Sequence, residues 1–196
     1  MKLTHKFAEL TPDKRSGHLP HITTDLQGMS HNMEAVEATR TRFRPERITT
    51  LFVGESAPAS GDFFYYGYNA MQRHMQSAME DSLGGDGGDF FERFKAYGWY
   101  LDDLVLTPVD KLTRSERNAK CSAAQKSLET RIAEYQPLAI VSLLISIKTF
   151  VDAAAIAAGS SAPRFAVPFP GMGQQARFKA AMLQIIPTLP RLPDRL

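Results

Sequence analysis

The sequence contains a single cysteine, Cys121, among its 196 residues. One thiol cannot close a disulfide within the chain, and it cannot supply the several thiolates that hold a structural zinc ion or an iron–sulfur cluster. The spacing typical of a metal site is also missing from the five histidines, which are His5, His18, His21, His31 and His74. We therefore expect no metal ion and no cofactor.

Long apolar runs are missing as well. The longest, Leu138–Ile147, contains Ser142 and Ser146 and is too short to cross a bilayer. Charged residues, beginning with Lys2, interrupt the N-terminal stretch where a signal peptide would have its apolar core. We expect a cytoplasmic protein with no membrane partner.

Neither sign of charge is in large excess. The chain has 23 Lys and Arg against 21 Asp and Glu, which gives a net charge of +2. This balance does not by itself indicate a nucleic-acid-binding protein, but a local basic surface would be enough to attract phosphates. One such group in the sequence consists of Arg40, Arg42, Arg44 and Arg47.

The composition suffices for a hydrophobic core, because 43% of the residues are hydrophobic and 22% are charged. The length suits one ordinary domain. We expect an N-terminal extension with a helix and a basic segment over residues 1–47, the main domain over residues 48–187, and a Pro-rich tail over residues 188–196. The protein is expected to be a monomer.

Strand-like and helix-like segments alternate along the chain. Short apolar or β-branched segments predict strands at Ile48–Val53, Leu104–Leu106, Leu138–Leu144 and Arg164–Val167. Helical periodicity and caps predict helices at residues 31–43, Ala70–Leu83, Phe90–Tyr97, Ser115–Tyr135, Ser146–Ala158 and Gln174–Ile186. This alternation predicts an α/β fold of three layers, α/β/α, in which the central layer is a short, mostly four-stranded parallel sheet.

Parallel strands bring their carboxyl ends to one edge of the sheet, and ligands of such folds bind beyond that edge. Three loops follow predicted strands and should meet there, namely the loops at Gly54, at Thr107 and at Phe169. We expect the functional site at this edge.

Four stretches in these loops and strands carry a resemblance to a known family. They are Leu51–Pro58, Phe63–Phe64, Asp102–Asp110 and Pro168–Gln174. In this order, the chain from about Ile48 to Ile186 resembles the uracil-DNA glycosylase superfamily. The resemblance implies a protein of DNA repair that binds a base flipped out of single-stranded or duplex DNA, and that cleaves the base from its sugar.

The resemblance implies a role for each matching residue. A carboxylate near the sugar would stabilise the cation that forms as the bond breaks, while hydrogen-bond donors and an aromatic ring would hold the base. The catalytic residues implied are Glu55 and Ser56. The substrate-binding residues implied are Gly54, Pro58, Phe63, Phe64, Asp103, Phe169, Pro170 and Gly171. Contacts to DNA phosphates are expected from Arg44, Arg47 and Arg177.

Three departures from the family pattern leave the activity open. Phe169 stands where the family usually has a histidine that donates a hydrogen bond to the leaving base. Ser56 stands where the classical enzymes have an Asp or Asn, and Asp102 or Asp103 replaces the usual base-reading asparagine. The departures suggest an altered choice of base, slow chemistry or none.

Each candidate also has a structural interpretation that the sequence leaves open. Glu55 could cap the turn after its strand, and Ser56 could bond the backbone of that turn. Phe63 and Phe64 could be core residues, the aspartates could be an exposed pair before a strand, and the arginines could form a solvated face. Two other functions therefore remain: a catalytically inactive module that binds nucleobases or nucleic acid, and an α/β protein that acts on a small nucleotide.

Overall fold

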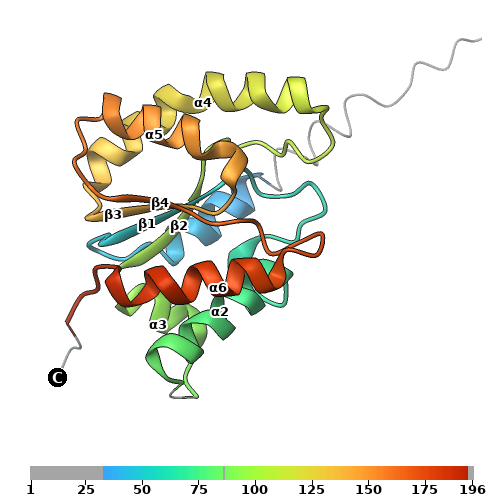
Figure 1. Cartoon of the computed structure of the whole chain (residues 1–196). Helices are drawn as coiled ribbons and strands as arrows, with labels where there is room; N and C mark the ends of the chain where they lie inside the picture. The colour runs from blue at the N-terminus through green and yellow to red at the C-terminus, as the bar shows by residue number, and fades with distance from the viewer. Residues whose placement is uncertain (1–32, 86, 194–196) are drawn as a thin grey trace, which may run out of the picture.

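The computed structural model describes residues 33–85 and 87–193, and its centre is a sheet of parallel strands (Figure 1). The strands are β1 (Thr50–Gly54), β2 (Trp99–Asp103), β3 (Ala139–Ser142) and β4 (Arg164–Ala166). Their order across the sheet is β2-β1-β3-β4, and every neighbouring pair is parallel. The central strand β1 is buried along its whole length, as its apolar sequence requires.

Helices cover both faces of this sheet. Helices α4 (Arg114–Tyr135) and α5 (Lys148–Ala157) lie on one face, while α2 (Ala70–Leu83), α3 (Phe90–Ala96) and α6 (Gln175–Ile185) lie on the other (Figure 1). The predicted three-layer α/β fold with a four-stranded parallel sheet is therefore confirmed. No helix in the described part of the chain combines the length and apolarity needed to cross a membrane.

Helix α2 shows how local sequence sets an element. It begins after Asn69, whose side chain accepts a hydrogen bond from the backbone N of Gln72 and donates to the carbonyl oxygens of Phe63 and Phe64. It ends at Gly84, which has a φ of 82°. The predicted helix, Ala70–Leu83, has these same bounds.

The second strand differs from its prediction. We predicted a strand at Leu104–Leu106, but β2 is Trp99–Asp103, and the apolar residues that follow belong to the next connection. The alternative interpretation of Asp102 and Asp103 as an exposed pair before a strand is likewise wrong, because both are buried at the end of β2. Ion pairs formed by arginines elsewhere in the chain make this burial tolerable, as described below.

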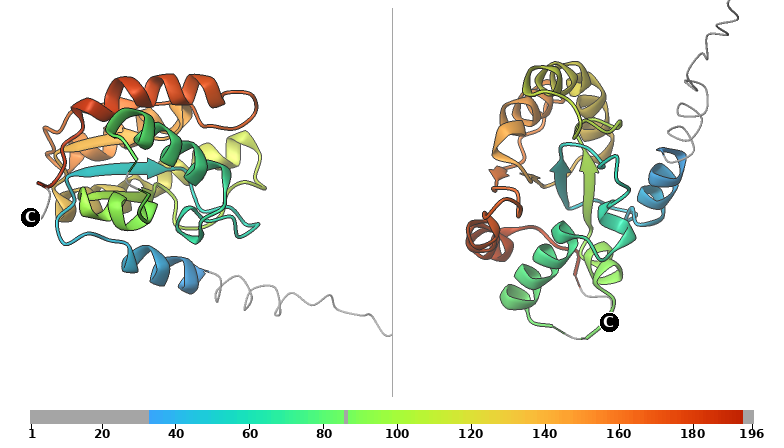
Figure 2. Two further views of the ribbon diagram at one scale, coloured as in Figure 1. Left: turned by 90° about the horizontal axis from the view of Figure 1, so that it is seen from below. Right: turned by 90° about the vertical axis from the view of Figure 1, so that its right-hand side faces the viewer.

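The segments at the two ends of the described chain pack against the sheet. A helix over residues 33–42 lies beside the β2 edge of the sheet (Figure 2, right) and places Val36 in the core. At the other end, the carbonyl oxygen of Pro190 accepts hydrogen bonds from Thr49, Thr50 and the indole N–H of Trp99. Residues 1–32 of the predicted extension and 194–196 of the predicted tail lie outside the described residues.

Candidate functional site

Exposed apolar side chains gather at the carboxyl edge of the sheet. The connections after β1, β2 and β4 lie together on the right-hand side of Figure 1. Among the described residues, eight large hydrophobic side chains are exposed, and six of them lie in connections that follow strands: Tyr66, Tyr68, Leu106, Ile145, Phe169 and Met172. Because ligands of such folds bind beyond this edge, these six residues are candidates for contact with a ligand.

A groove of about 490 Å³ lies at this edge, between the connections after β3 and β4. Its volume falls in the range of small-ligand sites, roughly 300–1,000 Å³. The groove is lined by Phe169, which is 43% exposed, and by Arg177 from the first turn of α6, whose Nη1 donates to Gln174 Oε1 at 3.2 Å. Its remaining lining residues are Leu144, Ile145, Ser146, Pro168 and Gln174.

Gly171 sets the position of the Phe169 ring. A Cβ placed on Gly171 would lie 2.8 Å from Cε1 and 2.9 Å from Cδ1 of Phe169, which is closer than real Cβ contacts. Only glycine therefore lets the ring lie over the backbone here. Pro170, between them, is buried, whereas Met172 is fully exposed with a φ of 50°. The loop thus presents two apolar side chains, Phe169 and Met172, at the edge of the sheet.

The segment that carries this loop is free of acidic residues. From Ala153 to Pro193 the sequence has no Asp or Glu, while it has Arg164, Arg177, Lys179 and Arg191. Residues 63–79, which include the start of α2, also lack carboxylates. Helices α2 and α6 are neighbours, because Nζ of Lys179 lies 2.6 Å from the Asp81 carboxylate and donates to the Ser77 hydroxyl at 3.1 Å. These two segments bring cationic side chains to an edge where the connections after β1 and β2 carry the carboxylates Glu55, Asp62 and Asp110.

Glu55, the predicted catalytic carboxylate, lies directly after β1 and forms an ion pair with Arg117 of α4. Both nitrogens of the guanidinium fork take part, since Nε and Nη2 of Arg117 each donate to one carboxylate oxygen. The side chain of Glu55 is 14% exposed and that of Arg117 is 34% exposed, so solvent reaches the pair. Glu55 is not one of the residues that line the groove.

Ser56 connects two loops of the carboxyl edge. Its hydroxyl oxygen accepts a hydrogen bond from the backbone N of Val109, 3.2 Å away in the connection after β2. The hydroxyl therefore binds a backbone N–H, as its structural interpretation predicted, but that N–H belongs to the connection after β2 and not to the turn that contains Ser56. Pro58, in the same loop as Ser56, is half-buried, and its carbonyl oxygen accepts a hydrogen bond from Gly61 N.

The aspartates that end β2 lie in a buried network of ion pairs. Arg40 donates through Nη1 to Asp102 at 2.7 Å and through Nη2 to Asp103 at 2.9 Å. Arg131 of α4 donates to the other carboxylate oxygen of Asp102 and to the carbonyl oxygens of Asp103 and Leu104. Nε of Arg40 also lies 3.2 Å from Glu37 Oε1, without the geometry of a hydrogen bond.

The contacts in this network shift the pKa values of Asp103 and Arg40. Burial raises the pKa of Asp103, and Arg40 opposes that increase. Burial lowers the pKa of Arg40, but Asp103 and Asp102 more than offset this, so the pKa of Arg40 lies above its ordinary value. Arg40 is 2% exposed and is therefore unavailable to a phosphate.

Phe63 and Phe64, the predicted base-stacking residues, are core residues here, at 2% and 5% exposure. Phe64 packs edge-on against Phe90 and Phe91 of α3, and the guanidinium of Arg40 lies 5.2 Å from the centre of the Phe63 ring. To stack on a base, either ring would first have to leave these contacts.

The arginines predicted to contact phosphates do not lie together. Arg177 lines the groove at the carboxyl edge. Arg44 and Arg47 are exposed and precede β1, which places them at the amino edge of the same sheet. Arg44 lies 3.8 Å from Glu134 and over the ring of Tyr135, near the end of α4.

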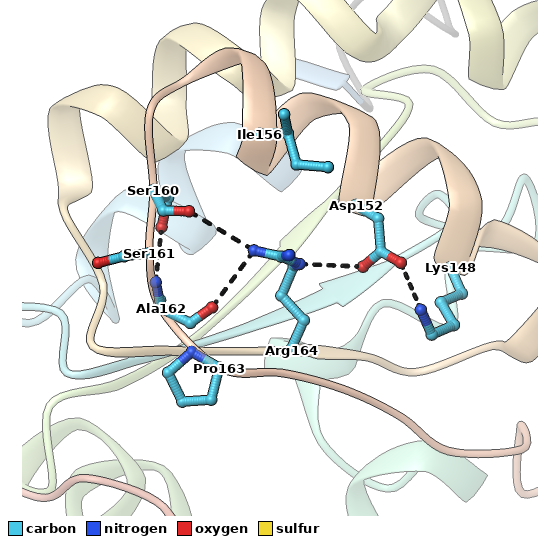
Figure 3. A pocket seen from close by; sticks show the side chains of 8 residues that line it. All are labelled: Lys148, Asp152, Ile156, Ser160, Ser161, Ala162, Pro163 and Arg164. Atoms are coloured by element: carbon cyan, nitrogen blue, oxygen red, sulfur yellow. Dashed lines mark hydrogen bonds and ion pairs between the residues drawn. The ribbon is translucent and has the colours of Figure 1, made fainter.

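A second hollow runs along α5 to the start of β4 (Figure 3). Its charged groups bind one another: Asp152 pairs with Lys148 and, at 3.4 Å, with Nε of Arg164. Arg164 also donates to the carbonyl oxygens of Ser160 and Ala162. These mutual contacts hold α5 against the edge strand and leave no concentrated charge for a ligand.

We did not predict from the sequence that Arg117 binds Glu55 or that Arg131 binds Asp102. The helical spacing of both arginines would have indicated that they face the sheet. Arg117 stands four residues before Cys121, and Arg131 stands three residues after Leu128, and both of those residues are buried on α4. An arginine three or four residues from a buried helical position lies on the side that faces the sheet. Tyr68 and Met172 were missed as well, since exposure and a positive φ cannot be read from the sequence.

Comparison with models of protein families gave no match, and comparison with curated proteins gave none either. The residues described here contain no group of three or more metal-ligating side chains.

Proposed function

We propose that this chain is a uracil-DNA glycosylase-like protein that binds a nucleobase flipped out of DNA, with the base held in the groove beside Phe169. The observation that carries the proposal is that an exposed aromatic residue, Phe169, and a cationic residue, Arg177, line the same groove at the carboxyl edge. Aromatic rings stack on any base, and arginine binds phosphate. Because residues 153–193 contain no carboxylates, this segment itself does not repel the DNA backbone.

Met172 suits the second task of such a protein, which is to disturb the base stack. It is fully exposed in a left-handed backbone conformation between two glycines. Proteins that distort DNA insert apolar side chains such as methionine between bases, at a cost of a few kcal/mol per base step. In our proposal, Met172 enters the stack while Phe169 holds the extruded base.

Hydrolysis of the N-glycosidic bond is the second candidate function. The observation that favours it is the position of Glu55, a partly solvent-accessible carboxylate at the end of the central strand. In this reaction the oxygen of water bonds to C1′ of the sugar as the bond from C1′ to the base nitrogen breaks. The base leaves with the bonding electrons and takes up a proton, and Glu55 stabilises the positive charge that builds on the sugar.

The Arg117 ion pair has a consequence for this chemistry. Because the guanidinium binds both carboxylate oxygens, Arg117 must turn away before Glu55 can act as a base or contact a sugar. A DNA phosphate near α4 would attract Arg117 and could release Glu55 in the presence of substrate.

Binding is tested by fluorescence anisotropy with labelled single-stranded and duplex oligonucleotides at a fixed salt concentration. We expect Phe169→Ala to weaken binding about tenfold or more, since one base stacked on an aromatic ring contributes about 1–3 kcal/mol. Ile156→Ala is a matched control, because Ile156 is an exposed apolar residue on α5. Equal affinity of the wild type and Phe169→Ala would contradict the groove assignment.

Hydrolysis is tested with uracil-containing single strands and U:G duplexes, followed by alkali and a search for strand cleavage. Uracil is the first base to try because of the resemblance, and other damaged bases follow. Cleavage by the wild type but not by Glu55→Gln, prepared identically, would support the enzyme. DNA binding without cleavage of any base would leave the inactive binding module.

A further inference from the structure

A second group of exposed aromatic side chains lies outside the groove. Tyr68 is 94% exposed and Tyr66 is 42% exposed, and both belong to the connection between β1 and α2. A tyrosine ring almost wholly in water loses the stabilisation that burial would give it, about 1.5–3 kcal/mol for a large apolar side chain. Nothing in the packing of the described core explains this exposure.

The backbone holds Tyr68 in its exposed position. Its φ is 59°, a left-handed conformation that is uncommon for a bulky side chain. Nη1 of Arg73 donates to the carbonyl oxygen of Tyr68 at 2.7 Å, and Asn69, the next residue, caps helix α2. Strained residues held in this way are concentrated at functional sites.

Tyr66 is fixed differently. Its ring packs edge-on against the buried Phe63 ring, with 5.3 Å between the ring centres and an angle of 81°. One side of Tyr66 is thus anchored on the core while the rest of the ring remains exposed. The connection therefore presents two exposed tyrosine rings: that of Tyr66 is anchored on the Phe63 ring, and that of Tyr68 extends from a backbone held by Arg73.

Cationic side chains follow these rings in the sequence, and Asp62 precedes them. Residues 63–79 include Arg73 and His74 and contain no Asp or Glu. Helix α2, which follows the tyrosines, is a neighbour of α6, which follows the Phe169 loop, through the contacts of Lys179. Both helices start at the same side of the molecule and run in the same general direction (Figure 1). The tyrosines and the groove therefore lie at the same edge of the protein, an edge that also carries Glu55 and Asp62 in the connection after β1.

We infer that Tyr66 and Tyr68 form a second stacking platform for single-stranded DNA, which receives bases that flank the one in the groove. This inference rests on the proposed function and specifies its substrate as single-stranded DNA. Bases of a single strand are free to turn onto aromatic rings, whereas those of a duplex remain paired and stacked. The cationic Arg73 beside the rings provides charge for the phosphates between those bases.

The test compares two labelled oligothymidylates, one of about 4 and one of about 12 nucleotides, across the site sizes known for single-strand-binding domains. Tyr68→Asn removes the ring but retains a residue that tolerates a positive φ, and Tyr68→Phe retains the ring. We expect Tyr68→Asn to weaken binding of the longer strand about tenfold and to change binding of the shorter strand much less. Tyr68→Phe should bind both strands like the wild type.

Parallel measurements on Phe169→Ala separate this inference from the proposed function. If Phe169→Ala weakens binding of both strands while Tyr68→Asn changes neither, the groove stands and the second platform is refuted. If only Tyr68→Asn weakens binding, the rings bind single-stranded DNA, but the groove assignment fails and the inference that they flank a base in the groove is overturned. Lack of binding by the wild type refutes both. If instead the wild type self-associates in sedimentation and Tyr68→Asn does not, the rings contact a second copy of the chain and the inference is overturned.

Discussion

The carboxylate of Asp103 lies directly against Gly54, its partner in the register of β1 and β2. A Cβ on Gly54 would be 2.3 Å from Asp103 Oδ1, well inside van der Waals contact. The other oxygen of the same carboxylate is bound to Arg40. The end of the central strand is thus shaped around a buried ion pair, and a glycine is what makes room for it.

Gly54→Ala should therefore destabilise the protein. The new methyl group would push Asp103 away from Arg40, and forcing extra volume into a packed site costs about 1–3 kcal/mol. Urea unfolding followed by the fluorescence of Trp99, the single tryptophan, would measure the loss. Gly85→Ala is the control, because its Cβ would meet only the flexible Glu80 side chain at 3.5 Å. A Gly54→Ala protein as stable as the control would contradict this account.

Arg40→Leu should destabilise the protein by about 3–5 kcal/mol, since breaking a buried ion pair leaves charge without a partner. Asp103 would lose its arginine, whereas Asp102 would keep Arg131. The same unfolding experiment on Arg42→Leu, an exposed residue of the same helix, should show a much smaller change. Equal effects of the two substitutions would show that the network contributes little.

Stability should also depend on pH through Asp103. Its pKa is raised above the ordinary 3.8 by burial, so the folded state binds the proton more tightly than the unfolded state. The stability that Asp103 contributes is therefore fully present below its unfolded pKa and is lost as pH rises through its folded pKa. In unfolding free energies measured from about pH 4 upward, the wild type should lose stability relative to Asp103→Asn. If the difference in unfolding free energy between the two proteins does not change with pH, the raised pKa of Asp103 is refuted.

The cap of α2 offers a local test. Asn69→Ala removes the acceptor for Gln72 N, and losing such a cap typically costs about 1 kcal/mol. Asn69→Asp retains that acceptor but loses the donors to Phe63 and Phe64, so its stability should lie between those of Asn69→Ala and the wild type. Thermal unfolding would rank the three proteins, and an Asn69→Asp protein less stable than Asn69→Ala would contradict the proposed order.

Gly171→Ala should affect binding more than stability. The added methyl group would displace the Phe169 ring, which is partly exposed and free to move, so unfolding should change by no more than about 0.5 kcal/mol. Affinity for a single-stranded oligonucleotide should fall toward that of Phe169→Ala. Gln175→Ala, at an exposed position in the adjacent helix, serves as the control. Unchanged affinity of Gly171→Ala would mean that the ring position does not matter for binding.

The sequence by itself determined the class of fold and several element ends. The alternation of apolar and amphipathic segments predicted the parallel α/β sheet, and Asn69 and Leu83 were correctly predicted as the cap and the last residue of α2. These features follow from local rules, because period and capping depend on residues a few positions apart. The predicted strand Ile48–Val53 overlaps β1, which is Thr50–Gly54, so Glu55 was correctly expected near the end of a buried strand.

Only the tertiary structure decided where the charged residues lie. Asp102 and Asp103 resemble an exposed pair in the sequence, but they are buried because Arg40 contacts them from 62 and 63 positions away. Phe63 and Phe64 resemble pocket residues in a loop, but the rings of α3 enclose Phe64 and the guanidinium of Arg40 lies over Phe63. The free energy of burying a charge or a ring depends on the partner that meets it in space, and for these residues the partner is distant in the chain.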